Sequence, residues 1–181
     1  QLIYFGKVNQ ELYQLNTCDI IQSFQPVRDD LGKLYTGIYF TELIDTLLKE
    51  ADHSKELFHL LLEALHSLLA QNNTGTLRLL FEIRIISLLG YAPRLAYCIH
   101  CKKEPDTEWV GFSYNLSGVI CAMCIRQVKS EIKIRAGTLS YLKKLLVMDI
   151  KQSQRLKISK DIENEIEALT HRLVLSHVGR E

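Results

Sequence analysis

Two Cys-x-x-Cys pairs constrain this chain of 181 residues more than any other feature of its sequence. The first pair is Cys98 and Cys101, and the second pair is Cys121 and Cys124. Each pair can supply two thiolates from one tight turn, and the intervening chain can return the second pair to face the first. The spacing therefore predicts a tetrahedral site in which the four cysteines hold one structural zinc ion.

The segment between the two pairs supports this prediction. Residues 109–114 are rich in aromatic and β-branched side chains, residues 115–118 are typical of a turn, and Val119 and Ile120 lead into the second pair. We therefore expect a small hairpin, which buries too little apolar surface to fold alone and is stabilised by the metal. Four thiolates leave no open position for an activated water, and this argues against a zinc hydrolase.

Other uses of the cysteines stay open at this point. The pairs could be redox dithiols, disulfides or small core residues, but a thioredoxin-type motif opens a helix in a βαβ pattern, and disulfide frameworks belong to secreted chains. His100 could replace one cysteine as a ligand. The fifth cysteine, Cys18, has no sequence partner and is expected to be a buried strand residue. Reduced cysteines beside a metal site point to the cytoplasm.

The spacing of the apolar residues changes near Pro26. Residues 1–25 favour strands, and two or three strands do not form a stable sheet alone, so they look like the end of a β-domain. Residues 26–181 have helical periodicity, and we expect a mainly α fold: a helical bundle with the zinc element at 98–124 inserted after its third helix. The expected strands are 2–5, 11–15 and 19–24, and the expected helices are about 27–48, 55–71, 76–89, 124–134, 138–148 and 159–177.

Positive charge is concentrated after the second cysteine pair. Residues 126–160 contain ten Lys or Arg and two Asp or Glu, whereas the whole chain has a net charge of +1. Clustered cations gain affinity for a polyanion by releasing its counterions, so we favour phosphate contact over a solvated face. Lys102 and Lys103 are explained equally well as balancing the charge of the four thiolates. The candidate DNA-binding residues are Arg126, Lys129, Lys133, Arg135, Lys143 and Lys144.

The sequence shows no catalytic signature. It contains no glycine-rich phosphate loop, no nucleophile elbow and no Glu beside a His pair, so we expect a chain that is not an enzyme. No apolar run approaches the roughly 20 residues that span a bilayer, and the first residues do not resemble a signal peptide, so we expect no membrane segment. The chain begins with Gln1 rather than Met, and we expect a fragment of a longer protein.

Residues 89–95, which approach the first cysteine pair, read Leu-Gly-Tyr-Ala-Pro-Arg-Leu, and the cysteine pairs then enclose Phe112-Ser113 and Gly118-Val119-Ile120. This segment resembles the zinc-bearing segment of the bacterial RecO family. Stretches within 21–43 resemble the junction between that family's barrel and its helical domain, and residues 171–180 resemble its C-terminal helix. The similarity runs nearly end to end, and its most specific part is the Gly-x-x-Pro-x-Leu approach to the cysteines.

The resemblance implies the fold and role of a recombination mediator. Residues 1–25 would be the terminal strands of an OB-fold barrel that is mostly absent, and residues 26–181 would form the helical domain. The implied role is to bind single- and double-stranded DNA, anneal strands, and load RecA with the partner RecR on DNA coated by single-stranded-DNA-binding protein, whose acidic, apolar C-terminal tail the helical domain captures. The implied location is the bacterial cytoplasm, at the nucleoid. The alternative is a zinc-stabilised module that docks acidic partner tails without binding DNA.

Overall fold

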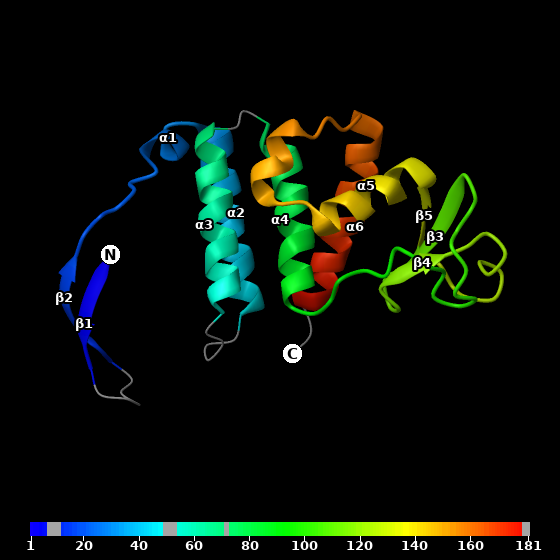
Figure 1. Cartoon of the computed structure of the whole chain (residues 1–181), viewed down its shortest axis with the longest axis horizontal. Coiled ribbons are helices and arrows are strands. Elements are labelled where there is room, and N and C mark those ends of the chain that lie inside the picture. The colour runs from blue at the N-terminus through cyan, green and yellow to red at the C-terminus, as the bar shows by residue number, and fades with distance from the viewer. Residues whose placement is uncertain (7–11, 49–53, 71–72, 179–181) are drawn as a thin grey trace.

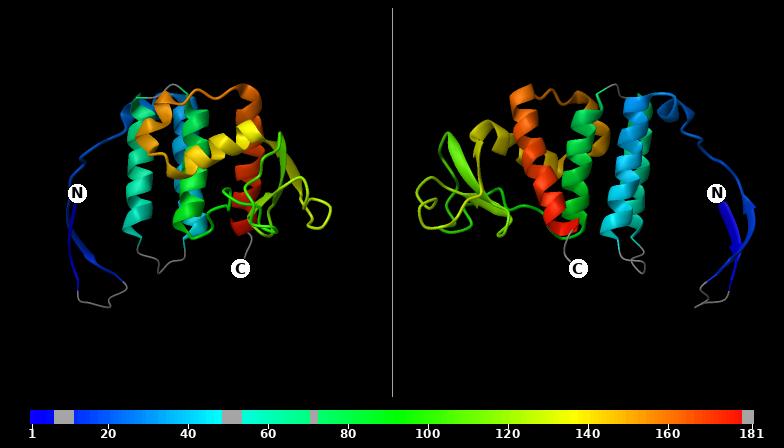
Figure 2. Two further views of the ribbon diagram at one scale, coloured as in Figure 1. Left: turned by 45° about the vertical axis from the view of Figure 1, so that its right-hand side comes forward. Right: turned by 180° about the vertical axis from the view of Figure 1, so that it is seen from behind.

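The computed structural model describes residues 1–6, 12–48, 54–70 and 73–178. Its parts lie in a row: a two-stranded hairpin near the N-terminus, a helical bundle in the middle, and a small sheet at the far end (Figure 1). The additional views in Figure 2 keep the hairpin and the small sheet on opposite sides of the bundle. The prediction of a mainly α chain is thus confirmed. Within the described ranges, no helix has the length and apolar character needed to cross a bilayer.

The N-terminal hairpin consists of two antiparallel strands, β1 (Leu2–Phe5) and β2 (Gln14–Cys18). Every residue of both strands is exposed, because a two-stranded sheet has no second layer to cover it. The predicted strand at 19–24 is wrong, since this stretch has no neighbouring strand to pair with and leads directly into a helix. Cys18 ends β2 and is exposed, so the expectation that it is buried is also wrong.

The bundle is built around one central helix. This helix, α4, packs against four other helices and one 3-10 segment, η1. The elements of the bundle are α1 (Gln25–Arg28), α2 (Leu31–Leu47), α3 (Lys55–Ala70), α4 (Thr74–Leu88), α5 (Ala136–Val147), η1 (Ile150–Arg155) and α6 (Lys160–Val178). The four helices that contact α4 are α2, α3, α5 and α6, and the short α1 packs against α2 and α3.

Helix α4 is buried on all sides. Between Thr76 and Ile86 it carries nine buried residues, which point in every direction around the axis. The sequence predicts a single apolar stripe, but Leu79 and Ile83 on the other side of the helix are buried as well, whereas Leu88 is exposed. A helix that is apolar all round belongs in the interior, where neighbours cover each face.

Glycine at position 90 ends α4 as the sequence predicts. Gly90 has a φ of 85°, a left-handed conformation that residues with a side chain rarely adopt. The backbone N–H of Gly90 donates to the carbonyl of Ser87, and the N–H of Tyr91 donates to the carbonyl of Ile86 at 2.9 Å. These two bonds form a Schellman motif, which stops the helix and turns the chain toward the cysteine pairs.

The small sheet has three antiparallel strands in the order β4-β3-β5. The predicted hairpin is confirmed as β3 (Trp109–Ser113) and β4 (Gly118–Ile120). The predicted helix at 124–134 is wrong: turns follow Cys124, and Ile132–Arg135 form β5, which pairs with the free edge of β3. Two isoleucines alternate with two basic residues in β5, so its apolar period is that of a strand.

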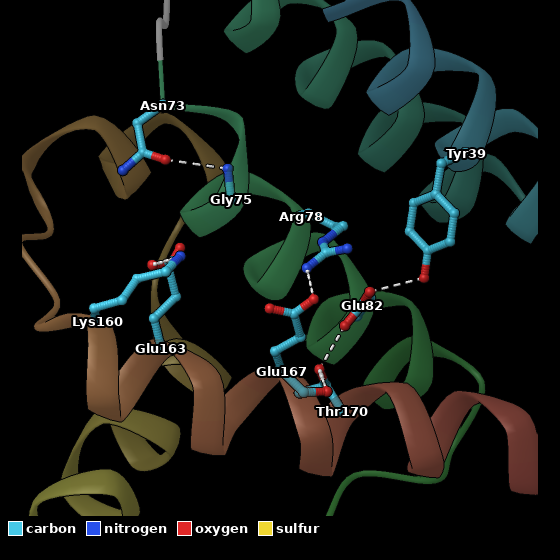
Figure 3. A network of polar contacts seen from close by, with 9 residues as sticks. All are labelled: Tyr39, Asn73, Gly75, Arg78, Glu82, Lys160, Glu163, Glu167 and Thr170. Atoms are coloured by element: carbon cyan, nitrogen blue, oxygen red, sulfur yellow. Dashed lines mark hydrogen bonds and ion pairs between the residues drawn. The ribbon is translucent and has the colours of Figure 1, made fainter. Parts of the chain in front are cut away.

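One buried carboxylate links three helices of the bundle (Figure 3). Glu82 of α4 accepts a hydrogen bond from the Tyr39 hydroxyl of α2 at 2.7 Å and from the Thr170 hydroxyl of α6 at 2.5 Å. Burial raises the pKa of Glu82 above its ordinary value, although the two donors and Arg78 act in the opposite direction. Arg78 of α4 also pairs with Glu167 of α6, so the contact between α4 and α6 is polar as well as apolar.

Glu82→Ala should lower the free energy of unfolding by about 3 kcal/mol, because it removes the acceptor of the buried Thr170 hydroxyl and the half-buried Tyr39 hydroxyl and opens a cavity. Urea denaturation measures this loss. Glu42→Ala on the exposed side of α2 is the matched control, and it should change the unfolding free energy by less than about 0.5 kcal/mol. Equal effects of the two substitutions would contradict the role assigned to Glu82.

Candidate metal centre and basic surface

The four predicted ligands come together at one point. The Sγ atoms of Cys98, Cys101, Cys121 and Cys124 all lie within 4.8 Å of one another. The Sγ atoms of Cys101 and Cys121 are 3.7 Å apart. A tetrahedron with a metal–sulfur bond of about 2.3 Å has sulfurs about 3.8 Å apart. The four cysteines are therefore positioned to bind a metal ion, and their geometry is compatible with zinc.

Backbone hydrogen bonds shape the two turns that carry the sulfurs. In the first turn, the N–H of Lys102 donates to the carbonyl of Cys98 at 3.0 Å, and Lys102 has a φ of 61°. In the second turn, the N–H of Cys124 donates to the carbonyl of Cys121 at 3.0 Å. The N–H of Ile99 donates to the carbonyl of Val119 at 2.9 Å and so fixes the first turn against β4. The metal site is thus partly ordered by the chain itself.

A glycine allows the first turn to lie this close to β4. A Cβ atom on Gly118 would lie 2.3 Å from Cγ2 of Ile99 and 3.1 Å from the carbonyl oxygen of Arg94. The same Arg94 carbonyl accepts a hydrogen bond from the N–H of Val119 at 3.0 Å. The chain that leads to the first cysteine pair is therefore docked on β4 at a position where a side chain does not fit.

The pKa values of two of the thiols, Cys98 and Cys124, are shifted in opposite directions. Burial alone raises the pKa of Cys98, but hydrogen bonds from the backbone N–H groups of Cys121, Cys101 and His100 bring it down to about 6. Burial and the three neighbouring sulfurs raise the pKa of Cys124 to about 12. Four crowded thiols cannot all ionise unless a cation offsets their charge, and a bound metal ion supplies that charge.

The alternative uses of the cysteines fit this geometry less well. All four cysteines are free thiols, and the distance of 3.7 Å between Cys101 and Cys121 is far longer than the about 2.05 Å of a disulfide. The first pair lies in a turn and does not open a helix, as a thioredoxin-type pair does. His100 is exposed, and the group of ligand atoms consists of the four cysteines.

The six candidate DNA-binding residues fall into two groups. In the first, Arg126 and Lys129 are exposed in the turns after the second cysteine pair, and Lys133 and Arg135 are exposed on β5. Arg135 forms an ion pair with Glu165 at 3.2 Å. No ion pair involves Arg126, Lys129 or Lys133 within the described part of the chain.

The second group lies on α5, which faces the first cysteine turn. Lys143 is 3.5 Å from Glu104, and Lys144 lies over the ring of Tyr141 with its Nζ atom 5.2 Å from the ring centre. We call residues 98–135, which contain the two cysteine turns and the small sheet, the metal element. The structure brings Lys143 next to this element but does not join the six residues into one cluster.

A hollow of about 440 Å³ lies between α5 and the first cysteine turn. Its wall is mainly apolar, and the positive side chains of Arg94, Lys102 and Lys143 also line it. The position of this hollow could not be predicted from the sequence, because it forms only when residues 93–102 pack beside α5. Lys102 and Lys103 are exposed, and the Lys102 ammonium group donates to the carbonyl of Ile99 at 3.0 Å.

Comparison with known proteins gives a consistent result over most of the chain. The family model described as "Recombination protein O C terminal" matches residues 28–181. A DNA repair protein RecO from Pelotomaculum thermopropionicum is 29% identical over 172 residues, which cover 95% of this chain and 66% of that protein. The DNA repair protein RecO of Symbiobacterium thermophilum is 30% identical over 186 residues, which cover 97% of this chain and 73% of that protein. The DNA repair protein RecO of Desulforamulus reducens is 31% identical over 160 residues, which cover 88% of this chain and 62% of that protein. The chain thus spans about two thirds of the length of these relatives.

Cys124→Ser should remove the metal and lower the free energy of unfolding by about 3 kcal/mol, which corresponds to about 10 °C in Tm for a chain of this size. Metal content by mass spectrometry and thermal unfolding on the same sample measure both effects. Cys18→Ser, at the exposed cysteine of β2, is the matched control and should change neither.

Metal content measured as a function of pH tests whether the metal is bound by ionised thiols. Metal binds thiolates, and below pH about 6 even Cys98 holds its proton, so metal affinity should fall as the pH falls. Metal that stays bound equally well from pH 8 to pH 5, or a Cys124→Ser variant that retains it, would contradict a site formed by the four cysteines.

Proposed function

This chain belongs to the family described as Recombination protein O C terminal, and we propose that it is part of a DNA-binding recombination mediator that acts in DNA repair. The observation that carries the proposal is the group of unpaired cations on the metal element. Arg126, Lys129 and Lys133 are exposed and free of ion pairs in the described ranges, so phosphate groups can reach them. Cations in such a position bind single and double strands alike through their phosphates.

In this proposal the metal has a structural role. The four cysteines hold one zinc ion, which closes the two turns and so fixes the place of the basic residues that follow Cys124. Cations that neutralise two strands at once also lower the repulsion between them, and this is the physical basis proposed for strand annealing. Four thiolates fill the coordination sphere, so the metal has no open position for catalysis. The proposed role needs none.

The whole protein, in this proposal, loads RecA together with RecR on DNA coated by single-stranded-DNA-binding protein, in the bacterial cytoplasm at the nucleoid. Strands β1 and β2 would belong to the end of an OB-fold barrel, with residues 26–181 as the helical domain. Apolar side chains exposed on the hairpin support this, because further strands of a barrel would cover them. The exposed apolar residues in the described part of the hairpin are Leu2, Ile3, Tyr4, Phe5, Leu12, Tyr13 and Leu15.

A second candidate function rests on the hollow beside α5. Its apolar wall and three cations suit an acidic protein tail that ends in an apolar residue, such as the tail of single-stranded-DNA-binding protein. Lys143 is held only by a weak, partly exposed ion pair with Glu104, so a carboxylate of the tail can replace that partner. This function can accompany DNA binding or, in a module that binds proteins alone, stand in its place.

The DNA proposal is tested by a salt titration of single-stranded DNA binding to the purified chain. Replacing Arg126, Lys129 and Lys133 together with Ala should weaken binding at least tenfold and reduce the slope of log affinity against log salt by about 2, since each lost phosphate contact contributes about 0.7.

The matched control removes the same charge elsewhere, at Lys151, Arg155 and Lys157 of the η1 region. It should leave the slope nearly unchanged. If the two triple variants lose the same affinity, the contact is not at the metal element, and if the wild-type chain binds no DNA, the proposal is wrong.

The tail proposal is tested with a labelled acidic peptide that ends in an apolar residue. Reversing two charges of the hollow, in the variant Lys102→Glu/Lys143→Glu, should weaken peptide binding at least tenfold in fluorescence anisotropy, because each cation is replaced by a repelling group. The variant Lys129→Glu/Lys133→Glu changes the net charge equally on the metal element. Equal losses in the two variants would argue against the hollow as the docking site.

A further inference from the structure

A tryptophan marks a second hollow on the outer face of the small sheet. Trp109 is the single tryptophan of the chain and begins β3. It pairs with Arg135 of β5, and Gly111 pairs with Lys133. Residues directly opposite each other in a sheet share a face. The same face therefore carries the indole ring and two cations, while Val110 and its neighbours on the other face are buried in the core.

The hollow itself has a volume of about 350 Å³ and is lined by Trp109, Val110, Ala122, Ile125 and Lys133. The three apolar residues on this side of the sheet are Trp109, Ala122 and Ile125. Lys133 adds a lysine that has no ion pair in the described ranges. Volumes of about 300–1,000 Å³ are typical of sites that hold a small planar molecule. The lining thus combines an aromatic ring, an apolar wall and one positive charge.

Because Gly111 has no side chain, the second cysteine turn can pack directly against this face of the sheet. A Cβ atom on Gly111 would lie 3.1 Å from Cδ1 of Ile125 and 2.9 Å from Cβ of Ser130. The turn therefore rests directly on the sheet, and it supplies the Ala122 and Ile125 side of the hollow. The bound metal and the hollow are structurally linked, because both depend on the position of this turn.

The indole ring is held in place before any ligand arrives. The guanidinium carbon of Arg135 lies 5.4 Å from the centre of the ring, and Arg135 is itself fixed by Glu165 of α6 at 3.2 Å. The Thr107 hydroxyl donates to the carbonyl of Trp109 at 2.6 Å. Trp109 is nevertheless 41% exposed, so part of it stays available for contact. An aromatic side chain that is already ordered loses little entropy on binding.

We propose that this hollow accepts one unpaired nucleobase of single-stranded DNA, stacked on Trp109, with an adjacent phosphate at Lys133. The inference rests on the proposed function, because the strand that enters the hollow is the one that the cations of the metal element contact. A polyanion with planar bases matches both the charge and the aromatic wall of the site. Bases of a duplex are already stacked and paired, so the hollow favours single strands over duplex.

The test uses the fluorescence of Trp109, which reports on this hollow alone. The purified chain of 181 residues is titrated with a thymidine oligonucleotide and with an abasic oligonucleotide of the same length and charge. The thymidine strand should quench the fluorescence and bind about tenfold more tightly, because stacking adds to phosphate contact. The abasic strand should bind through its phosphates with little quenching.

Substitutions of Trp109 test whether the preference for the thymidine strand comes from base stacking or from an effect on folding. Trp109→Ala should remove the preference for the thymidine strand, and Trp109→Phe, which keeps a stacking ring, should retain most of it; both are followed by anisotropy of labelled strands. Tyr35→Ala removes an aromatic side chain of α2 that is 64% exposed, and it should leave the preference intact.

The outcomes distinguish this inference from the function on which it rests. Equal affinity for the two strands, without quenching by either, would overturn the nucleobase site and leave DNA binding in place. If an acidic peptide quenched the fluorescence and DNA did not, the hollow would bind a protein partner and not a nucleobase. If neither strand binds, the proposed function and the nucleobase site are both wrong.

Discussion

The burial of α4 on every face is the constraint on which the rest of the fold depends. An isolated helix with this composition would expose apolar side chains in all directions, so α2, α3, α5, α6 and η1 must surround it. The polar group that α4 carries into this interior, Glu82, is tolerated because hydroxyls from two different helices donate to it. Glu82 therefore fixes the positions of α2 and α6 along α4, because a shift of either helix would leave the buried carboxylate without one of its donors.

The small sheet joins two separately stabilised regions. Its inner face, with Val110, Phe112 and Ile134, belongs to the main core, whereas Cys98, Ile120 and Cys124 form a second apolar cluster around the metal ligands. The chain leaves α4 through Gly90, builds the metal element, and returns through β5 directly into α5. Because β5 is continuous with α5 and the inner face of the sheet packs into the main core, order in the metal element and order in the bundle are coupled.

The sequence predicts those features that depend on local spacing. The cysteine pairs, the hairpin between them, the end of α4 at Gly90 and the mainly α fold follow from short-range patterns. The failures have a tertiary cause. Residues 124–134 contain enough apolar residues for a helix, but the open edge of β3 captures Ile132–Arg135 as a strand. The stripe predicted for α4 was too narrow because its second face is covered by elements distant in sequence. Neither hollow could be predicted, since each is lined by segments that meet only in the folded chain.

The two hollows share no lining residue, and this separation would suit the mediator role that we propose. A protein that removes a strand from its protective coat must hold the coat protein and the strand at the same time. If one basic patch served both, the acidic tail and the DNA would compete for the same cations, and each would displace the other. Here the first cysteine turn and α5 line one hollow, and the second cysteine turn and the outer face of the sheet line the other. The four-cysteine site connects the two turns, so a metal ion bound there would fix both hollows, while the cations that line them belong to different residues.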